Sequence, residues 1–358
     1  MSAATKPLQV LLVGTGRMAQ THALRFAEID GIEVVAAVDV NQKRLDVFCT
    51  THGIEHGYTQ LEQALAAHDL DAVSVVTPDA LHAQVSIKAL QAGLPVLCEK
   101  PLSDTTEASK DMVAAAATAG VLNMVNLSYR VSGALHQARL WVDQGRLGEI
   151  RHVDAAYRQS WLASPYWGEW SEEEAWLWRL STAHGSTGVL GDIGIHILDF
   201  VTAGVGMDIS GLQCRLQTFD KAPGNQIGEF CLDANDSCVI NLEMSNGALG
   251  VVQMSRYQTG YFNDLSLTIH GTEGALQVST GQAGDRLLSC IGETRHEPAW
   301  TQIDCESQPD TFDRFVDALM SGQSGSPDFA HAAELQHYLE RCLESHEQGR
   351  WLACDRIA

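Results

Sequence analysis

A glycine-rich turn directly follows the first apolar run of this 358-residue chain. It reads Gly14-Thr15-Gly16-Arg17-Met18-Ala19 and opens a helical pattern. In a G-x-G-x-x-A turn, the first glycine permits the tight bend, the second lets the backbone approach a pyrophosphate, and the small last residue allows close helix packing. The free N–H groups at the helix start attract phosphate. An ordinary glycine-rich turn would look alike, but the pattern favours a dinucleotide site at Gly14, Thr15, Gly16, Arg17 and Met18.

Short apolar runs alternate with longer helical patterns from Leu8 to about Asn126. This alternation is typical of a parallel sheet with helices on both faces. The runs expected to form strands are Gln9–Val13, Glu33–Asp39, Ala72–Thr77, Pro95–Cys98 and Val121–Asn126. We therefore predict an α/β doubly wound Rossmann domain over residues 1–127.

The pattern changes after Gly148. Long alternating runs such as Ile150–Gln159 and Ala248–Tyr257 are joined by turn sequences such as Asn246-Gly247, which is typical of antiparallel strands and hairpins. Two helical patterns then close the chain. Residues 128–358 are therefore predicted to form an α+β domain with a large, mostly antiparallel sheet.

Asp39 ends the second expected strand, where a carboxylate would hydrogen-bond the adenosine ribose hydroxyls of NAD. The same charge repels the 2′-phosphate of NADP. Lys43 and Arg44 follow closely, so NADP stays open as the less favoured cofactor.

The other unusual polar residues of the first half also come just after expected strands. They are Thr77, Pro78 and His82, then Glu99 and Lys100, and then Asn126. In an open α/β sheet, the ligand crevice lies outside the carboxyl ends of the strands. We expect these residues to bind the cofactor together with the glycine turn and Asp39.

Charge and cysteine content narrow the partners and the compartment. The net charge of −22 disfavours nucleic acid and anionic membrane surfaces. Nine cysteines without disulfide or zinc spacing indicate reduced thiols and no metal site. No segment has the pattern of a secretory signal or a membrane span, so we predict a cytoplasmic protein.

The chain resembles the Gfo/Idh/MocA family, named after glucose–fructose oxidoreductase, inositol dehydrogenase and rhizopine catabolism. Five segments carry the resemblance, in the family's order: Gly14 to Ala19, Thr77-Pro78-Asp79-Ala80-Leu81-His82, Glu99-Lys100-Pro101, Ser128-Tyr129-Arg130, and Gly191-Asp192-Ile193-Gly194-Ile195-His196-Ile197-Leu198-Asp199. Asp79 departs from the family, which more often has Asn there. The resemblance implies an open C-terminal sheet, assembly into homodimers or homotetramers through that sheet, and catalysis by Lys100, Asp192 and His196.

The residues themselves support this implication. Asp192, His196 and Asp199 are spaced i, i+4 and i+7, so on a helix they form one polar stripe. Histidine is a side-chain type that titrates near neutral pH, so His196 is suited to act as a general base, with Asp192 orienting its ring. Lys100 is placed to stabilise a developing alkoxide. Which of Lys100 and His196 accepts the proton first stays open.

An aromatic segment accompanies these residues. Five of the eight tryptophans fall between Trp161 and Trp178, and aromatic faces stack on sugar rings. A hydrophobic core or a subunit interface would use them equally well. Arg130, Trp161 and Asp199, together with Lys100, Asp192 and His196, are the residues expected to bind substrate, and related sugar and inositol enzymes hold hydroxyls at the positions of Arg130 and Asp199.

Together these features predict an NAD-dependent dehydrogenase that oxidises a secondary hydroxyl of a sugar, anhydrosugar or cyclic polyol to a ketone or lactone. Two alternatives share the fold: a reductase of an unsaturated or imine substrate, and a non-catalytic NAD-sensing regulator. The presence of Lys100, Asp192 and His196 together favours alcohol oxidation.

Overall fold

The computed structural model describes residues 6–357, and the chain divides into two compact units. The first unit takes the chain up to Ser128 together with Pro309–Gln336, and the second comprises Tyr129–Gln308 and His337–Arg356. The predicted boundary between residues 127 and 128 assigned all later residues to the second domain. The packing differs because α9 (Thr311–Ser321) buries Phe312, Phe315 and Val316 in the core of the first unit.

The first unit is built on a six-stranded sheet whose strands are all parallel, in the order β3-β2-β1-β4-β5-β6. The strands are β1 (Leu8–Val13), β2 (Ile32–Val38), β3 (His56–Tyr58), β4 (Ala72–Val75), β5 (Val96–Cys98) and β6 (Asn123–Val125). This confirms the predicted Rossmann sheet. β3 was not among the expected strands, because His56-Gly57-Tyr58 contains no run of apolar residues.

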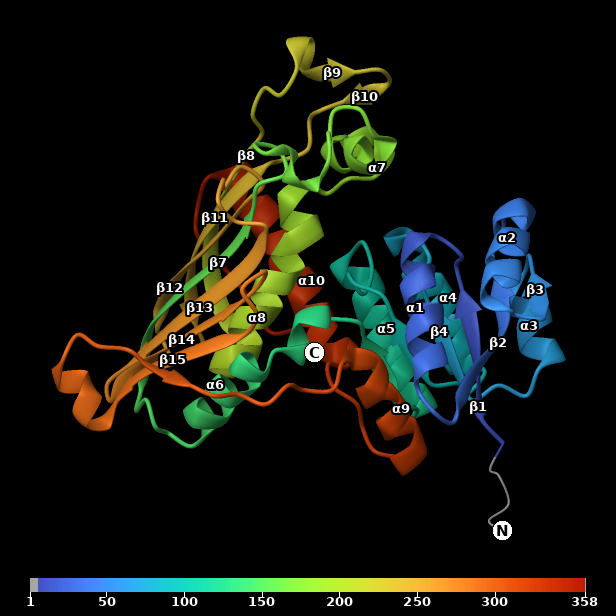
Figure 1. Cartoon of the computed structure of the whole chain (residues 1–358), viewed down its shortest axis with the longest axis horizontal. Helices are drawn as coiled ribbons and strands as arrows, with labels where there is room; N and C mark the ends of the chain where they lie inside the picture. The colour runs from blue at the N-terminus through green and yellow to red at the C-terminus, as the bar shows by residue number, and fades with distance from the viewer. Residues whose placement is uncertain (1–5, 358) are drawn as a thin grey trace. The chain divides into compact units, whose positions relative to one another are not determined.

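Helices cover both faces of this sheet (Figure 1). They are α1 (Arg17–Glu28), α2 (Gln42–His52), α3 (Leu61–Ala67), α4 (Asp79–Gln91) and α5 (Thr106–Ala119), with α9. Local chemistry sets their ends. The side chain of Asn41 accepts a hydrogen bond from the N–H of Arg44 at the start of α2, and Gly53 ends this helix in a left-handed conformation.

The second unit contains a nine-stranded sheet in the order β16-β15-β14-β13-β7-β12-β11-β8-β17. The strands are β7 (Ile150–Gln159), β8 (Ile209–Gln217), β11 (Ser237–Met244), β12 (Leu249–Ser255), β13 (Asn263–Gly271), β14 (Gly274–Thr280), β15 (Arg286–Ile291), β16 (Thr301–Ile303) and β17 (Leu352–Ala353). Only β12 and β7 pair in parallel among these strands. The mostly antiparallel sheet is confirmed.

One face of this sheet is packed against helices. α6 (Gly133–Asp143) contacts β14 and β15, while α8 (Ile195–Val205) contacts β7 and β13. From His337 onward, α10 (Phe329–Gln348) also belongs to this unit, and the Ser345 hydroxyl accepts a hydrogen bond from the N–H of Cys214 on β8. On the other face, Val239 and Leu249 are 45% and 56% exposed. α8 is buried along its whole length.

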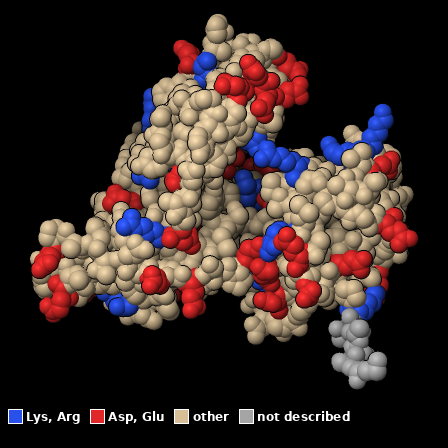
Figure 2. Space-filling view, viewed as in Figure 1, with Lys and Arg blue, Asp and Glu red and all other residues tan. Residues whose placement is uncertain are grey.

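Among the described helices, none combines the length and apolar composition needed to cross a bilayer. Acidic side chains are spread over the visible face of both units rather than gathered in one patch (Figure 2). This distribution accords with the net charge of −22.

Candidate functional site

The glycine turn leaves room for a ligand beside the start of α1. Gly14 has φ of +99°, and a Cβ there would lie 2.4 Å from the carbonyl oxygen of Val76, so only glycine fits. A Cβ on Gly16 would meet nothing within 4 Å. No side chain caps the N-terminus of α1, so its N–H groups remain available to a pyrophosphate.

Asp39 lies directly beside this turn. Its carboxylate accepts hydrogen bonds from the N–H and hydroxyl of Thr15 at 2.9 and 2.7 Å, and from the N–H of Asn41 at 2.8 Å. The guanidinium of Arg44 donates at 3.0 and 2.7 Å. Burial opposes ionisation, but the bonds from Arg44, Thr15 and Asn41 outweigh it and lower the pKa of Asp39 to about 2. The carboxylate is therefore ionised at neutral pH.

Glu99 stands at the centre of a buried network at the ends of β4, β5 and β6. Its carboxylate contacts His22 Nε2 at 2.9 Å and accepts bonds from the Asn126 amide at 2.6 Å and the Lys100 N–H at 3.1 Å. His22 Nδ1 lies 2.7 Å from the Ser74 hydroxyl. Burial would raise the pKa of Glu99, but His22, Asn126 and the Lys100 charge lower it to about 2.

His82 carries a second link between strand ends. Nδ1 lies 2.8 Å from the carbonyl oxygen of Pro101, and Nε2 lies 2.8 Å from that of Thr77. A carbonyl oxygen can only accept, so both ring nitrogens must donate and the ring is an imidazolium. Burial opposes this charge, but Cys98, Asp79 and the Pro101 carbonyl raise the pKa of His82 to about 10.

This arrangement revises the predicted role of His82. The side chain is fully buried and both nitrogens are engaged with the backbone, so the ring holds the two turns together and offers no nitrogen to a cofactor. Thr77 Oγ1, by contrast, is buried and has no hydrogen-bond partner within residues 6–357. It is therefore able to bond a ligand.

In the second unit, the predicted stripe begins in a π-helical turn, Leu190–Gly194, that leads into α8. Asp192 lies in this turn, and His196 and Asp199 lie on buried α8. Asp199 is 2% exposed and binds the Arg130 guanidinium at 2.6, 2.8 and 3.0 Å. The predicted substrate residues Arg130 and Asp199 are thus bonded to each other.

A polar network that the sequence did not reveal adjoins His196. The rings of Tyr129 and His196 meet edge to face at 5.1 Å. The Tyr129 hydroxyl lies 2.5 Å from that of Tyr157, and Asn263 bonds both hydroxyls at 2.7 Å. Gln159 donates to the Asn263 oxygen at 2.9 Å. Tyr129 was quoted only as part of a motif, and no spacing indicated the other three.

Trp161 lies in a hydrophobic cluster, which is one of the alternatives left open for the aromatic segment. It is 1% exposed, its indole N–H donates to Gln159 at 3.0 Å, and its ring packs against Trp176 at 5.2 Å. In the aromatic segment, Tyr166 and Trp178 are instead 64% and 40% exposed. Aromatic composition could not distinguish a buried ring from an exposed one.

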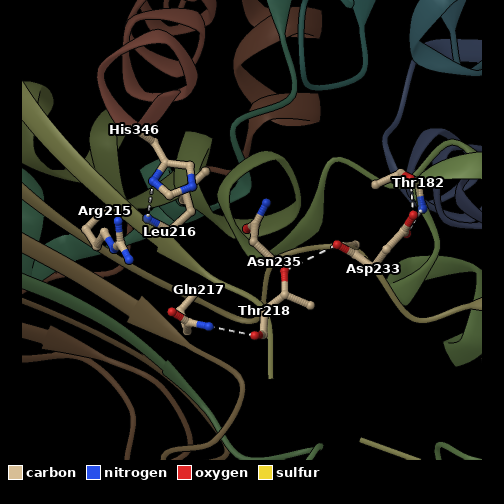
Figure 3. A pocket seen from close by; sticks show the side chains of 9 residues that line it. Thr182, Arg215, Leu216, Gln217, Thr218, Asp233, Asn235 and His346 are labelled. Carbon is tan, nitrogen blue, oxygen red and sulfur yellow. Dashed lines mark hydrogen bonds between the residues drawn. The ribbon is translucent and has the colours of Figure 1, made fainter. Parts of the chain in front are cut away.

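A separate pocket of about 380 Å³ lies in the second unit (Figure 3). Its lining includes Arg215, Gln217, Asp233 and His346. The carboxylate of Asp233 accepts bonds from the N–H and hydroxyl of Thr182 at 2.8 and 2.7 Å. None of the predicted site residues lines this pocket.

Two family models match the chain. Residues 8–127 match the Gfo/Idh/MocA oxidoreductase family with its NAD-binding Rossmann fold, and residues 135–277 match the C-terminal domain of that family. The chain belongs to the Gfo/Idh/MocA oxidoreductase family. The residues present fit NAD: the turn at Gly14 and Gly16 can receive the pyrophosphate, Asp39 can bond the ribose, and Thr77 has a free buried hydroxyl among the described residues.

Named relatives of this Gfo/Idh/MocA protein act on sugars and inositol. It is 28% identical to levoglucosan dehydrogenase of Pseudarthrobacter phenanthrenivorans over 75% of this chain and 73% of the relative. It is 25% identical to inositol 2-dehydrogenase of Pseudarthrobacter chlorophenolicus over 98% and 96%. A solved levoglucosan dehydrogenase with NADH and L-sorbose has a TM-score of 0.84 and 25% identity over 99% of this chain and 100% of that one.

The predicted family, fold class, NAD cofactor and oxidoreductase activity are therefore confirmed for this Gfo/Idh/MocA protein. The first unit gathers the predicted strand-end residues Thr77, His82, Glu99 and Asn126 around the Lys100 backbone. The individual roles of the site residues stay predictions. His22, a polar residue on the buried face of α1, was missed, although its position among apolar neighbours was a signal that could have found it.

Proposed function

We propose that this oxidoreductase oxidises a secondary hydroxyl of a sugar, anhydrosugar or cyclic polyol. The observation that carries the proposal is the density of polar groups around His196. Hydroxyls of Tyr129 and Tyr157 and the amide of Asn263 form one bonded cluster beside its ring. A ligand with several hydroxyls suits such a surface. The names of the levoglucosan and inositol dehydrogenases support the same substrate class.

Lys100, Asp192 and His196 carry the chemistry in this proposal. NAD, when bound, would supply the hydride acceptor for this oxidation. His196 takes up the hydroxyl proton, and Asp192 orients its ring and stabilises the charged form. The Lys100 ammonium stabilises the developing alkoxide, and the bond from its backbone N–H to Glu99 fixes its place.

For the cofactor, we propose that the turn from Gly14 to Met18 holds the pyrophosphate and that Asp39 bonds the ribose. Thr77, Pro78, Glu99, Lys100 and Asn126 follow strands β4, β5 and β6 at the same edge of the sheet. Thr77 and Asn126 are the residues of this edge that we expect to contact the nicotinamide half.

The test is a panel of inositols, aldoses, sugar acids and anhydrosugars with NAD and NADP, followed by the absorbance of reduced nicotinamide. On the best substrate, Lys100→Ala and His196→Ala should each lower kcat by roughly 100-fold or more while NAD binding persists. Lys88→Ala is the control, because Lys88 is a half-exposed partner of Glu62 on the surface. Wild-type rates in both site variants would refute the assignment.

We also propose that copies of the chain associate through the exposed face of the nine-stranded sheet. Val239 and Leu249, at 45% and 56% exposure, are apolar side chains on strands β11 and β12. Light scattering should show a dimer or tetramer, and Val239→Lys with Leu249→Lys should shift it toward monomer. A monomeric wild type would contradict this.

A cytoplasmic location is our inference from the thiols. None of the nine cysteines forms a disulfide within residues 6–357, as expected in a reducing compartment. Cell fractionation tests it.

A further inference from the structure

Arg256 follows the end of β12 and is 0% exposed. Its backbone fixes it on both sides: its N–H donates to the Asp236 carbonyl at 3.1 Å, and its own carbonyl accepts from the N–H of Leu162 at 3.2 Å. Because β12 pairs in parallel with β7, Arg256 emerges beside the segment that follows β7 and contains Trp161. The sheet thus carries a cation into the interior of the second unit.

The guanidinium makes three kinds of contact. Nη2 donates to Asp192 Oδ2 at 3.1 Å, and Nη1 donates to the Arg179 carbonyl at 3.2 Å. Its carbon lies 4.9 Å from the centre of the Trp161 ring, in cation–π range. Nε has no hydrogen-bond partner in the described part of the chain. The Arg256 guanidinium therefore contacts the segments of Arg179 and Trp161 as well as the carboxylate of Asp192.

A buried guanidinium is costly unless a counter-charge lies beside it. Asp192 supplies that charge here, and Arg179 approaches the same oxygen only to 3.9 Å. The bond from Arg256 fixes the direction in which the Asp192 carboxylate points and places a positive charge beside it. A neutral side chain of similar size could fill the space but could not do either.

Asp192 precedes His196 by one helical turn, and the proposed function gives its carboxylate the role of orienting that ring. The other charged or titratable groups that face Asp192 come from several elements. They include Arg256 after β12, Arg179, Tyr129 and Tyr157 on β7, and His196 follows on α8. Of Arg256 and Arg179, Arg256 lies nearer to the carboxylate.

We propose that Arg256 is a positioning residue that sets the orientation and the effective charge of Asp192 and acts on the reaction through it. This rests on the proposed function, in which Asp192 serves His196. Arg256 neutralises part of the carboxylate's charge. The protonated form of His196 is therefore favoured less than it would be beside an uncompensated carboxylate.

The experiment compares Arg256→Met and Arg256→Lys with Asp192→Asn on the best substrate. Arg256→Met should lower kcat about 10- to 100-fold, the range that a hydrogen bond to a charged group is worth, and leave NAD affinity unchanged. It should also move the acid limb of the pH–rate profile to higher pH. Arg256→Lys keeps the charge, so its limb should stay at the wild-type position, while kcat falls because an ammonium lacks the planar fork.

Two further variants separate this role from a structural one. Arg151→Met is the control, since Arg151 is 61% exposed and pairs only with Glu149 at the surface among the described residues. Because Arg256 acts through Asp192, the double variant Asp192→Asn/Arg256→Met should be no slower than Asp192→Asn. If Arg256→Met does not fold, the pH at which the acid limb of the Arg256→Lys profile lies still tests the inference.

The inference is wrong if kcat and the acid limb of the pH–rate profile are both unchanged in Arg256→Met. It is also wrong if the losses in the double variant are additive, or if the acid limb shifts in Arg256→Lys. The proposed function fails by a different result: Asp192→Asn with a wild-type rate. If Asp192→Asn is slow while Arg256→Met is not, the inference alone is wrong.

Discussion

In the first unit Glu99 is bonded by an imidazole, an amide and a backbone N–H, whereas in the second unit Asp199 is bonded by the guanidinium of Arg130. Both carboxylates are almost fully buried. The partners of Glu99 are neutral or titratable, while a guanidinium is always charged. The two units therefore stabilise a buried carboxylate with chemically different partners.

This difference predicts which change, in pH or in charge, most destabilises each unit. His82, with its raised pKa, makes the first unit sensitive to pH. The ion pairs of the second unit, Arg130 with Asp199 and Arg256 with Asp192, keep their charges across the neutral range but depend on both members. Removing a charge should therefore cost most in the second unit, and changing pH should act mainly on the first.

The largest effect is expected for Arg130→Met. It leaves the Asp199 carboxylate, 2% exposed, without its guanidinium, and the loss of one partner of a buried pair costs about 3–5 kcal/mol. Urea denaturation measures this cost. Arg130→Met combined with Asp199→Leu should recover much of it. A loss below about 1 kcal/mol in Arg130→Met would mean that the pair contributes no more than a surface pair.

A smaller effect, with a pH signature, is expected for His82→Gln. The variant loses two hydrogen bonds from a charged ring, about 3 kcal/mol in total. Because folding raises the pKa of His82 to about 10 from the ordinary histidine value of 6.5, its stabilisation is complete below pH 6.5 and disappears as pH rises through 10.

The stability difference between wild type and His82→Gln should therefore shrink from pH 6 to pH 10 in urea denaturation. His56→Gln is the control, because the His56 side chain is 46% exposed. The groups that face His82 are Asp79, Cys98 and the carbonyls of Thr77 and Pro101. A difference that does not vary with pH would show that the ring is neutral.

The smallest change in stability is expected for Asp39→Ala. Asp39 and Arg44 form an acid–arginine pair in the first unit, so this variant extends the comparison between the two units. The Arg44 side chain is 52% exposed, so its ion pair with Asp39 contributes at most about 1 kcal/mol. The Thr15 and Asn41 donors also lose their acceptor, which brings the expected total to about 2 kcal/mol. The effect appears in cofactor choice. The affinity for NAD should fall roughly 10-fold, about 1.4 kcal/mol, and the affinity for NADP should rise as Arg44 is released. Titration of both dinucleotides measures the ratio, and an unchanged ratio would contradict the role of Asp39.

The first unit could be predicted from sequence because a parallel sheet brings the carboxyl ends of its strands to one edge. Glu99 and Asn126 are therefore neighbours in space wherever their strands pair. The sequence could not reveal that His82 bonds two carbonyls, because that depends on the path of two turns. The sequence spacing between Thr77 and His82 is the same whether His82 binds a cofactor or hydrogen-bonds two buried turns.

The second unit was less predictable because its contacts depend on the order of strands. Asn263 bonds Tyr129 across 134 residues, and Arg256 reaches Asp192 across 64. Both contacts need the pairing of β7 with β12 and β13, and alternation of apolar residues does not specify which strands pair. Arg256 in particular follows a strand like any surface arginine.

The geometry of the site depends on the number of residues in the π-helical turn Leu190–Gly194 as well as on their identity. A residue in an α-helix turns about 100° around the axis. Deleting one residue inside the turn would restore regular winding and keep every charged side chain, yet it would swing Asp192 away from Arg256 by about that angle. Insertions and deletions in this stretch should therefore be far rarer among functioning descendants of this gene than point substitutions.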